Sequence, residues 1–229
     1  MTEQLTGCTI NSSHCKCLDS LTEEEKHQLE QKSVTLKYRK GEMIFKQGSF
    51  APYILHLEKG LAKVFLADNS DTLVLKVIPP GNLLGLTSLY KGDTVFHYSA
   101  QAYIDTEVKQ IDINFFRQLL LQNSLFAREV IDILISNSIQ INGRFFCLTY
   151  KQSYGRLADI LLCLADRIFN ASVFELNLSR KELAELSGLS TETTVRMLKQ
   201  FKEEKIIRIE GKKFQILDYD RLRKISDNG

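Results

Sequence analysis

The chain has 229 residues, of which 44% are apolar and 25% are charged. This is ordinary globular usage, so disordered, fibrous and collagen-like classes are excluded, and the length fits one large domain or two modest ones. Thirty basic and 28 acidic side chains leave a net charge of +2, which by itself indicates neither a nucleic acid nor a membrane as partner.

Targeting signals and cysteine content bear on the compartment. No apolar run approaches the roughly 18 residues of a membrane helix, and residues Met1 to Ile10 lack the basic start and apolar core of a secretion signal. The five cysteines are an odd number, which suits a reducing compartment better than a disulfide scaffold. We therefore expect a cytoplasmic protein without a membrane partner.

Glycine and proline punctuate the first half of the chain. Six glycines and all three prolines fall between residues 40 and 92. Segments with strand character lie at residues 61–66, 73–78, 95–104 and 107–111. This pattern predicts an all-β barrel or roll. From residue 112 onward proline is absent and the apolar residues take up helical spacing.

A long helix is predicted to begin near Ser124. Residues spaced by four and three form a heptad-like seam along it, namely Val130, Leu134, Asn137, Ile141, Arg144 and Leu148. A seam of this length indicates that the helix pairs with its counterpart in a second copy of the chain. The alternative is a single helix that lies along its own roll. A second helix is predicted from about Ser153 to Phe169.

Capping signals mark a short helix further along the chain. Ser179 and Glu182 have the spacing of a capping box, in which the serine hydroxyl accepts from a backbone N–H and the glutamate reaches back. The helix that they open ends near Gly188, which can take the left-handed conformation of a tight turn.

A second helix follows this turn, and Ser190 is its expected cap. We expect Val195, Leu198 and Phe201 to form its core face, and the outward face to comprise Thr191, Glu192, Thr193 and Arg196. A β-hairpin is predicted next, with strands at residues 206–209 and 214–217. Helix, turn, helix and hairpin together predict a winged helix-turn-helix.

With these motifs the chain resembles the Crp/Fnr family of bacterial transcription factors. The resemblance runs from about residue 20 to the end and is most specific at residues 178–184 and 188–198, with further support at 41–48, 57–60 and 80–85. It implies an α+β architecture in four parts. These are an N-terminal tail (1–18), a cyclic-nucleotide-binding-like β-roll sensor domain (19–122), a dimerisation helix (123–150) and a winged helix-turn-helix DNA-binding domain (151–229).

The resemblance places the second helix of the helix-turn-helix in the major groove, where its first turns face base edges. Glu192 can accept from the amine of cytosine, and Arg196 can donate to O6 and N7 of guanine. The alternative for this i,i+4 pair is a surface ion pair worth about 0.3–0.5 kcal/mol. Thr191 and Val195 complete the base-facing set. Phosphate contacts are expected from Ser190, Thr193, Arg180, Lys181, Lys199, Lys202, Lys212 and Lys213.

The residue at position 191 bears on the operator. Members of the fumarate–nitrate type share the glutamate and the arginine, and the cAMP receptor type adds an arginine just before the glutamate. Thr191 cannot make that bidentate guanine contact. We therefore expect a half-site that resembles TTGA more than TGTGA, present as an inverted repeat with centres about 34 Å apart.

The sensor departs from the cyclic-nucleotide pattern. Those members follow the glycine with a glutamate for the ribose and place an arginine on the phosphate just before Ser-Ala. Here Leu86 follows Gly85, and Tyr98 precedes the Ser-Ala pair. The free-energy cost of burying a phosphate without a countercharge is prohibitive. We therefore do not expect cAMP to bind, and the effector is unidentified. The expected effector pocket comprises Gly85, Leu86, Thr87, His97, Tyr98 and Ser99.

Iron–sulfur and haem cofactors remain open as alternatives. Oxygen-sensing family members hold a cluster on an N-terminal cysteine group plus one cysteine in the roll, and Cys8, Cys15 and Cys17 form such a group here. However, residues 18–146 contain no cysteine, and the last two cysteines, at 147 and 163, are expected to be small buried hydrophobes on helices. Haem has four candidate histidines, at 14, 27, 56 and 97, and none lies in a diagnostic motif.

A homodimeric, sequence-specific transcription regulator is the function that these features favour. Its expected partners are double-stranded DNA with an inverted-repeat operator, a second copy of the chain and RNA polymerase. The alternative is a ligand-binding or adaptor protein of the same fold without specific DNA binding, against which Glu192 and Arg196 argue. An enzyme is not expected, because no nucleophile elbow, phosphate loop or His-Glu-x-x-His pattern occurs.

Overall fold

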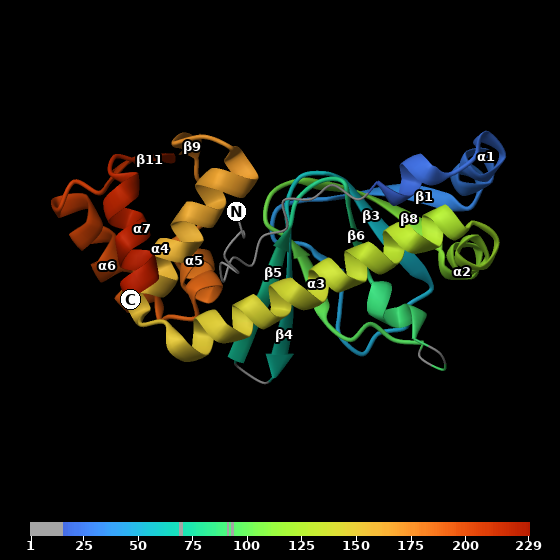
Figure 1. The fold of residues 1–229 in the computed structure, drawn as a ribbon, viewed down its shortest axis with the longest axis horizontal. Helices are drawn as coiled ribbons and strands as arrows, with labels where there is room; N and C mark the ends of the chain where they lie inside the picture. The colour runs from blue at the N-terminus through green and yellow to red at the C-terminus, as the bar shows by residue number, and fades with distance from the viewer. Residues whose placement is uncertain (1–15, 69–70, 91, 93) are drawn as a thin grey trace. The chain divides into compact units, whose positions relative to one another are not determined.

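A computed structural model describes residues 16–68, 71–90, 92 and 94–229 of the chain (Figure 1). These described residues fall into two compact units, one formed by residues of 16–71 and 77–138 and the other by 72–76 and 139–229. The long helix α3 (Ser124–Tyr150) contributes to both units. In the described part of the chain, no helix is long and apolar enough to cross a membrane.

Two four-stranded sheets form the β-roll. The first has the order β1-β8-β3-β6, with β1 at Ser33–Tyr38, β8 at Thr106–Asp112, β3 at Tyr53–Lys59 and β6 at Asn82–Leu84. The second has the order β2-β7-β4-β5, with β2 at Met43–Phe45, β7 at Ser99–Ala102, β4 at Ala62–Asp68 and β5 at Asp71–Ile78. The predicted roll is confirmed, although the strand expected at 95–104 is regular only over β7.

A tight corner joins β3 to β4 at Gly60. The glycine has φ +94°, and a Cβ there would lie 2.5 Å from the backbone oxygen of Asp105 and 2.6 Å from Cα of Thr106. Only glycine permits this close approach of two backbone segments without a shift. The corner therefore explains one of the glycines that punctuate the sequence.

Short helices close the roll. They are the 3-10 helices η1 (Cys17–Ser20) and η2 (Leu86–Leu89) and the α-helices α1 (Glu23–Gln31) and α2 (Ile113–Gln122). Phe116 of α2 and Phe126 of α3 pack edge to face with ring centroids 5.1 Å apart. Both belong to a buried core that also contains Ile54, Ile111 and Val130, so the first turns of α3 are held against the roll.

The second unit continues from α3 into α4 (Ser153–Cys163), which runs on as the π-helix η3 (Leu164–Phe169). Then follow β9 (Val173–Glu175), α5 (Arg180–Ser187), α6 (Thr191–Glu203), β10 (Ile207–Glu210), β11 (Lys213–Ile216) and α7 (Tyr219–Asn228). The strands form a sheet of order β10-β11-β9. The predicted helix-turn-helix and hairpin are thus present, and β9 and α7 are additions to them.

A buried polar cluster joins three parts of this unit at the carboxylate of Asp159 on α4. The Lys151 ammonium lies 2.9 Å from Oδ1, and Oδ1 also accepts from the hydroxyl of Ser226 on α7 at 2.5 Å. The Cys147 thiol at the end of α3 donates to Oδ2 at 3.5 Å. The charge of Asp159 is therefore balanced by a cation and two donors, as a buried carboxylate requires.

Candidate DNA-binding interface

Capping interactions define the first helix of the helix-turn-helix. The Ser179 hydroxyl accepts from Glu182 N–H at 3.1 Å, and the Glu182 carboxylate accepts from Ser179 N–H, which completes the predicted capping box. At the other end of α5, Gly188 has φ +63° and its N–H reaches the carbonyls of the last turn. A Cβ on Gly188 would lie 2.7 Å from Cδ2 of Leu148. The turn therefore needs glycine for its conformation and for its close packing.

The start of α6 is held by its own cap. The Ser190 hydroxyl accepts from Thr193 N–H at 3.1 Å and donates to the Thr193 hydroxyl at 2.9 Å. The buried residues of α6 are Thr194, Met197, Leu198 and Phe201. The prediction that Val195 belongs to this core face is wrong, because its side chain is 46% exposed and Thr194 takes the buried position beside it.

The four candidate base-reading residues all lie exposed on α6. They are Thr191, Glu192, Val195 and Arg196, within the first two turns of the helix. Within the residues that the structure describes, no ion pair joins Glu192 to Arg196. Their side chains are thus presented together on the side of α6 opposite its buried residues, where base edges could be contacted.

The candidate phosphate-binding residues occupy two places. Arg180 is half-buried, and the exposed lysines on the helices are Lys181, Lys199 and Lys202. Lys212 and Lys213 lie exposed at the hairpin turn between β10 and β11. Lys199 also lies 3.7 Å from the Glu203 carboxylate, and the hydroxyls of Ser190 and Thr193 bind each other.

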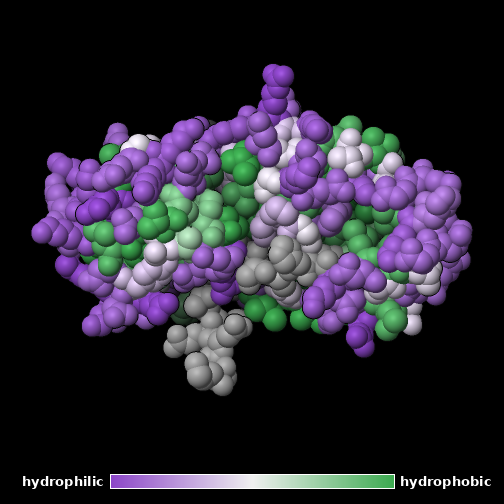
Figure 2. Space-filling model, turned by 90° about the horizontal axis from the view of Figure 1, so that it is seen from above, coloured by the Kyte–Doolittle hydropathy of each residue, from purple (hydrophilic) through white to green (hydrophobic). Residues whose placement is uncertain are grey.

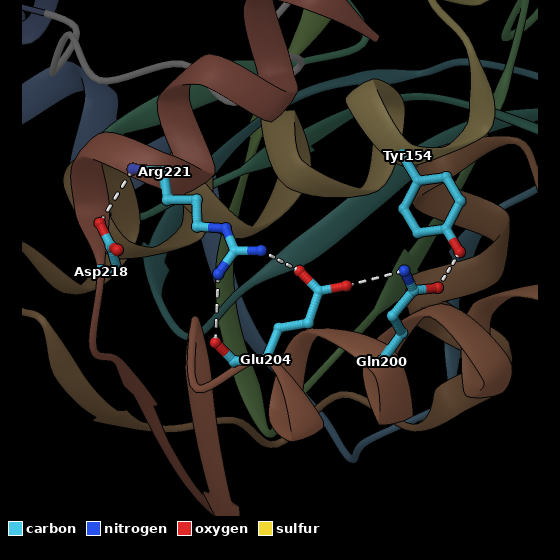
Figure 3. Close-up of polar contacts among 5 residues, drawn as sticks. All are labelled: Tyr154, Gln200, Glu204, Asp218 and Arg221. Carbon is cyan, nitrogen blue, oxygen red and sulfur yellow. Dashed lines mark hydrogen bonds and ion pairs between the residues drawn. The ribbon is translucent and has the colours of Figure 1, made fainter.

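A chain of polar contacts holds the far end of α6 (Figure 3). The hydroxyl of Tyr154 on α4 donates to Gln200, whose amide nitrogen donates to Glu204 Oε1 at 2.8 Å. Arg221 on α7 binds the Glu204 carboxylate and donates to the Glu204 carbonyl at 3.4 Å. Asp218 caps α7 by accepting from Arg221 N–H at 2.9 Å. These contacts were not predicted from the sequence, although Asp218 as a helix cap is a local signal for α7.

The six residues of the expected effector pocket do not share one environment. Tyr98 Oη accepts from Gly85 N–H at 2.8 Å and is also hydrogen-bonded to the Thr87 side chain. Leu86 is buried in the apolar core of the roll, and His97 is exposed. The Ser99 hydroxyl is buried and accepts from Gln47 N–H at 3.0 Å.

The predicted seam on α3 only partly faces outward. Val130 and Arg144 are 2% and 3% exposed, so the prediction that they face a second copy is wrong, because the chain itself covers them. Leu148 and Asn137 are half-buried, whereas Leu134 and Ile141 are exposed. A neighbouring apolar stripe is exposed instead, and it comprises Ile131, Leu134, Ile135, Ile139, Ile141, Phe145, Phe146 and Tyr150. We call this set the α3 stripe.

The candidate metal ligands are only partly within the described residues. Cys8, Cys15 and His14 lie outside them. Cys17 is fully buried, and Cys147 and Cys163 are buried on α3 and α4. Cys147 is a free thiol, as expected of a small hydrophobe, whereas Cys17 and Cys163 are disulfide-bonded, so that expectation is wrong for Cys163. Among the described residues no three His, Cys, Asp or Glu side chains are grouped to hold a metal ion. His56 is half-buried, and this burial lowers its pKa.

Comparison with known proteins agrees with both units. Residues 155–225 match the Crp-like helix-turn-helix domain, and residues 35–123 match the cyclic nucleotide-binding domain. The structure of FixK2 from Bradyrhizobium japonicum has a TM-score of 0.76 to this chain at 22% identity, covering 84% of this chain and 96% of that one. This likeness confirms the predicted fold class.

Relatives with assigned functions cover most of the chain. The transcriptional activator protein Anr of Pseudomonas protegens is 30% identical over 91% of this chain and 90% of its own length. The cAMP-activated global transcriptional regulator CRP of Escherichia coli O6:H1 is 26% identical over 77% of this chain and 86% of its own length. These relatives are regulators of transcription and not enzymes. The chain belongs to the Crp/Fnr family of transcription regulators.

Proposed function

We propose that the chain acts in the cytoplasm as a homodimer that binds an inverted-repeat operator. The observation that carries this proposal is the exposure of Thr191, Glu192, Val195 and Arg196 on α6, opposite residues that fix the helix to its unit. A helix presented in this way suits the major groove. RNA polymerase is a further proposed partner, because a relative of this chain is named a transcriptional activator.

Each side chain has a role that its chemistry supports. Arg196 donates to O6 and N7 of a guanine, and Glu192 accepts from the amine of a cytosine. Val195 lies between them and offers an apolar contact to a thymine methyl. Lys212, at the hairpin turn, contacts phosphate and so adds affinity without sequence preference.

The α3 stripe is the proposed dimer interface. A contiguous patch of exposed apolar side chains marks an interaction surface. The apolar residues of the stripe recur along one helix, as pairing between two helices requires. The proposed partner of the stripe is the same helix of a second copy, because a two-fold dimer matches an inverted repeat. Leu134 and Ile141 of the predicted seam are retained in this interface, and Val130 is not.

We also propose that cAMP is not the effector. Leu86 lies in the apolar core, and Tyr98 forms hydrogen bonds with its own chain. Neither residue can supply the countercharge that a buried cyclic phosphate needs. Calorimetry with cAMP checks this, and micromolar binding would contradict it.

The operator prediction is tested by selection from random DNA. The wild-type protein should select inverted TTGA-like half-sites. Arg196→Ala should weaken operator binding by roughly 1–3 kcal/mol and relax the choice at the guanine. Lys212→Ala is the matched control, since it should weaken all sequences alike and reduce the dependence of affinity on salt. A selection without an inverted repeat, or one that Arg196→Ala leaves unaltered, would refute the assigned roles.

A further inference from the structure

The place beside Gly85 in the β-roll is filled by a tyrosine of the same chain. Tyr98 Oη accepts from Gly85 N–H at 2.8 Å and is hydrogen-bonded to the Thr87 side chain. Burial raises the pKa of Tyr98 to about 12, against the opposing effect of these two hydrogen bonds. The phenol is therefore neutral throughout the physiological pH range.

Aromatic packing fixes the ring of this tyrosine. Phe45 and Phe96 are buried and stack with centroids 3.9 Å apart and planes 17° apart. The Phe45 ring also lies 5.6 Å from the Tyr98 ring at a tilt of 49°. A Cβ on Gly85 would lie 3.0 Å from Phe96, so the Gly85 backbone lies against the same aromatic group. The hydroxyl and the ring are thus held by different neighbours.

The surrounding polar groups are also satisfied within the chain. The Ser99 hydroxyl is buried and accepts from Gln47 N–H at 3.0 Å. Leu86, which directly follows Gly85, contributes an apolar side chain to the core. An incoming anion would have to break these contacts and would meet a neutral phenol in place of a cation, which is unfavourable for a buried charge.

We propose that the Tyr98 side chain is a built-in occupant of the roll, which fills the place of a small-molecule ligand beside Gly85. A neutral hydroxyaromatic group is the chemical class that this place accepts, because the contacts described for it are hydrogen bonds and aromatic faces. The contacts beside Gly85 are thereby completed by the chain itself, without added ligand. The inference rests on the proposed regulator function only in treating the roll as the sensor.

Chemical rescue tests the proposal on the full chain. Tyr98→Ala removes the phenol and leaves a space lined by the Phe45 ring and by the freed Gly85 N–H. Spaces lined by apolar side chains bind small aromatic molecules. Thermal unfolding is measured with increasing phenol or toluene. Phenol should raise the melting temperature of Tyr98→Ala in a saturable way. It should bind roughly tenfold more tightly than toluene, because one net hydrogen bond is worth about an order of magnitude in affinity.

Two controls define the outcomes. Wild type and Tyr90→Ala, which alters a tyrosine that is 74% exposed, should show no saturable stabilisation by phenol. The proposal is overturned if phenol and toluene act alike on Tyr98→Ala, or if phenol stabilises the controls equally. If Tyr98→Ala does not fold, Tyr98→Phe retains the ring and should speed hydrogen exchange at the Gly85 amide by about tenfold. Unchanged exchange there would also overturn the proposal.

These readouts separate the inference from the proposed function. None of them uses DNA, so a failure of phenol rescue leaves operator binding untouched. Conversely, a chain that bound no operator could still show the rescue, and the occupant of the roll would then be established for a protein of another role.

Discussion

A threonine stands at the position in α6 where a longer donor would add a second base reader. Thr191 is exposed at the first position of the helix, directly before Glu192. Its short side chain cannot form the two parallel hydrogen bonds that recognise a guanine. The proposed half-site therefore contains one strongly read G·C pair.

Replacing this threonine should change the operator that the protein selects. Thr191→Arg adds a bidentate donor and should shift selection toward a TGTGA-like half-site, with a preference of roughly 1–3 kcal/mol for the added guanine. Selection from random DNA is the measurement, and Thr191→Ala is the matched control, expected to return the wild-type motif. An arginine variant that selects the wild-type motif would place position 191 away from the bases.

At the scale of elements, the contact between α3 and α4 makes the second unit sensitive to alkaline pH. Burial and then the charge of Asp159 raise the pKa of Cys147 from 9.0 to about 11. Below the ordinary pKa the thiol is protonated in both states, so its contribution to stability is fully present. Between about pH 9 and about pH 11 the unfolded thiol ionises while the folded one keeps its proton. The free energy of unfolding therefore falls as pH rises, by at most about 1.4 kcal/mol per pH unit.

Chemical denaturation near pH 8 and near pH 10 checks this expectation. Cys147→Ala is the reference, because it retains every other titrating group of the chain. The stability of wild type relative to the variant should decrease as pH rises through this range. A difference that stays constant with pH would show that the thiol titrates alike in the folded and unfolded chain.

Some helices and strands can be predicted from their own residues more reliably than others. The helix-turn-helix is predicted by its capping residues and its turn glycine, whose hydrogen bonds reach only three or four residues along the chain. Helices α5 and α6 begin where these residues predict. The caps of α1, α2 and α7 are Thr22, Asp112 and Asp218, and each is an equally local signal for the start of its helix.

Long-range packing accounts for what could not be predicted. The spacing on α3 defines several parallel stripes, and which one is covered depends on where Phe126 and Val130 meet the core of the roll. In the sensor, Leu86 and Tyr98 indicated a departure from cyclic-nucleotide binding. The hydrogen bond of Tyr98 to Gly85 joins residues 13 positions apart and follows only from the fold of the roll.

At the scale of the whole molecule, one helix-turn-helix reads too little DNA to be selective. A single well-read base pair supplies roughly 1–3 kcal/mol of discrimination, whereas specific regulators exceed their own non-specific binding by about 4–10 kcal/mol. When two copies bind inverted half-sites, the discrimination free energies of both half-sites add and reach this range. Selective DNA binding by this chain therefore requires the proposed dimer.

Charged residues on the α3 stripe should separate the copies. Exposed apolar residues are visible among polar ones in the space-filling view (Figure 2), and Ile135 and Phe145 are 53% and 70% exposed on the stripe. Ile135→Glu combined with Phe145→Glu would bury four carboxylates in the dimer, so we expect monomers in sedimentation equilibrium and at least about a hundredfold loss of operator affinity. Leu121→Glu is the matched control, because Leu121 is 88% exposed on α2 and lies off the stripe. If the double variant sediments as a dimer, the interface lies elsewhere on the chain.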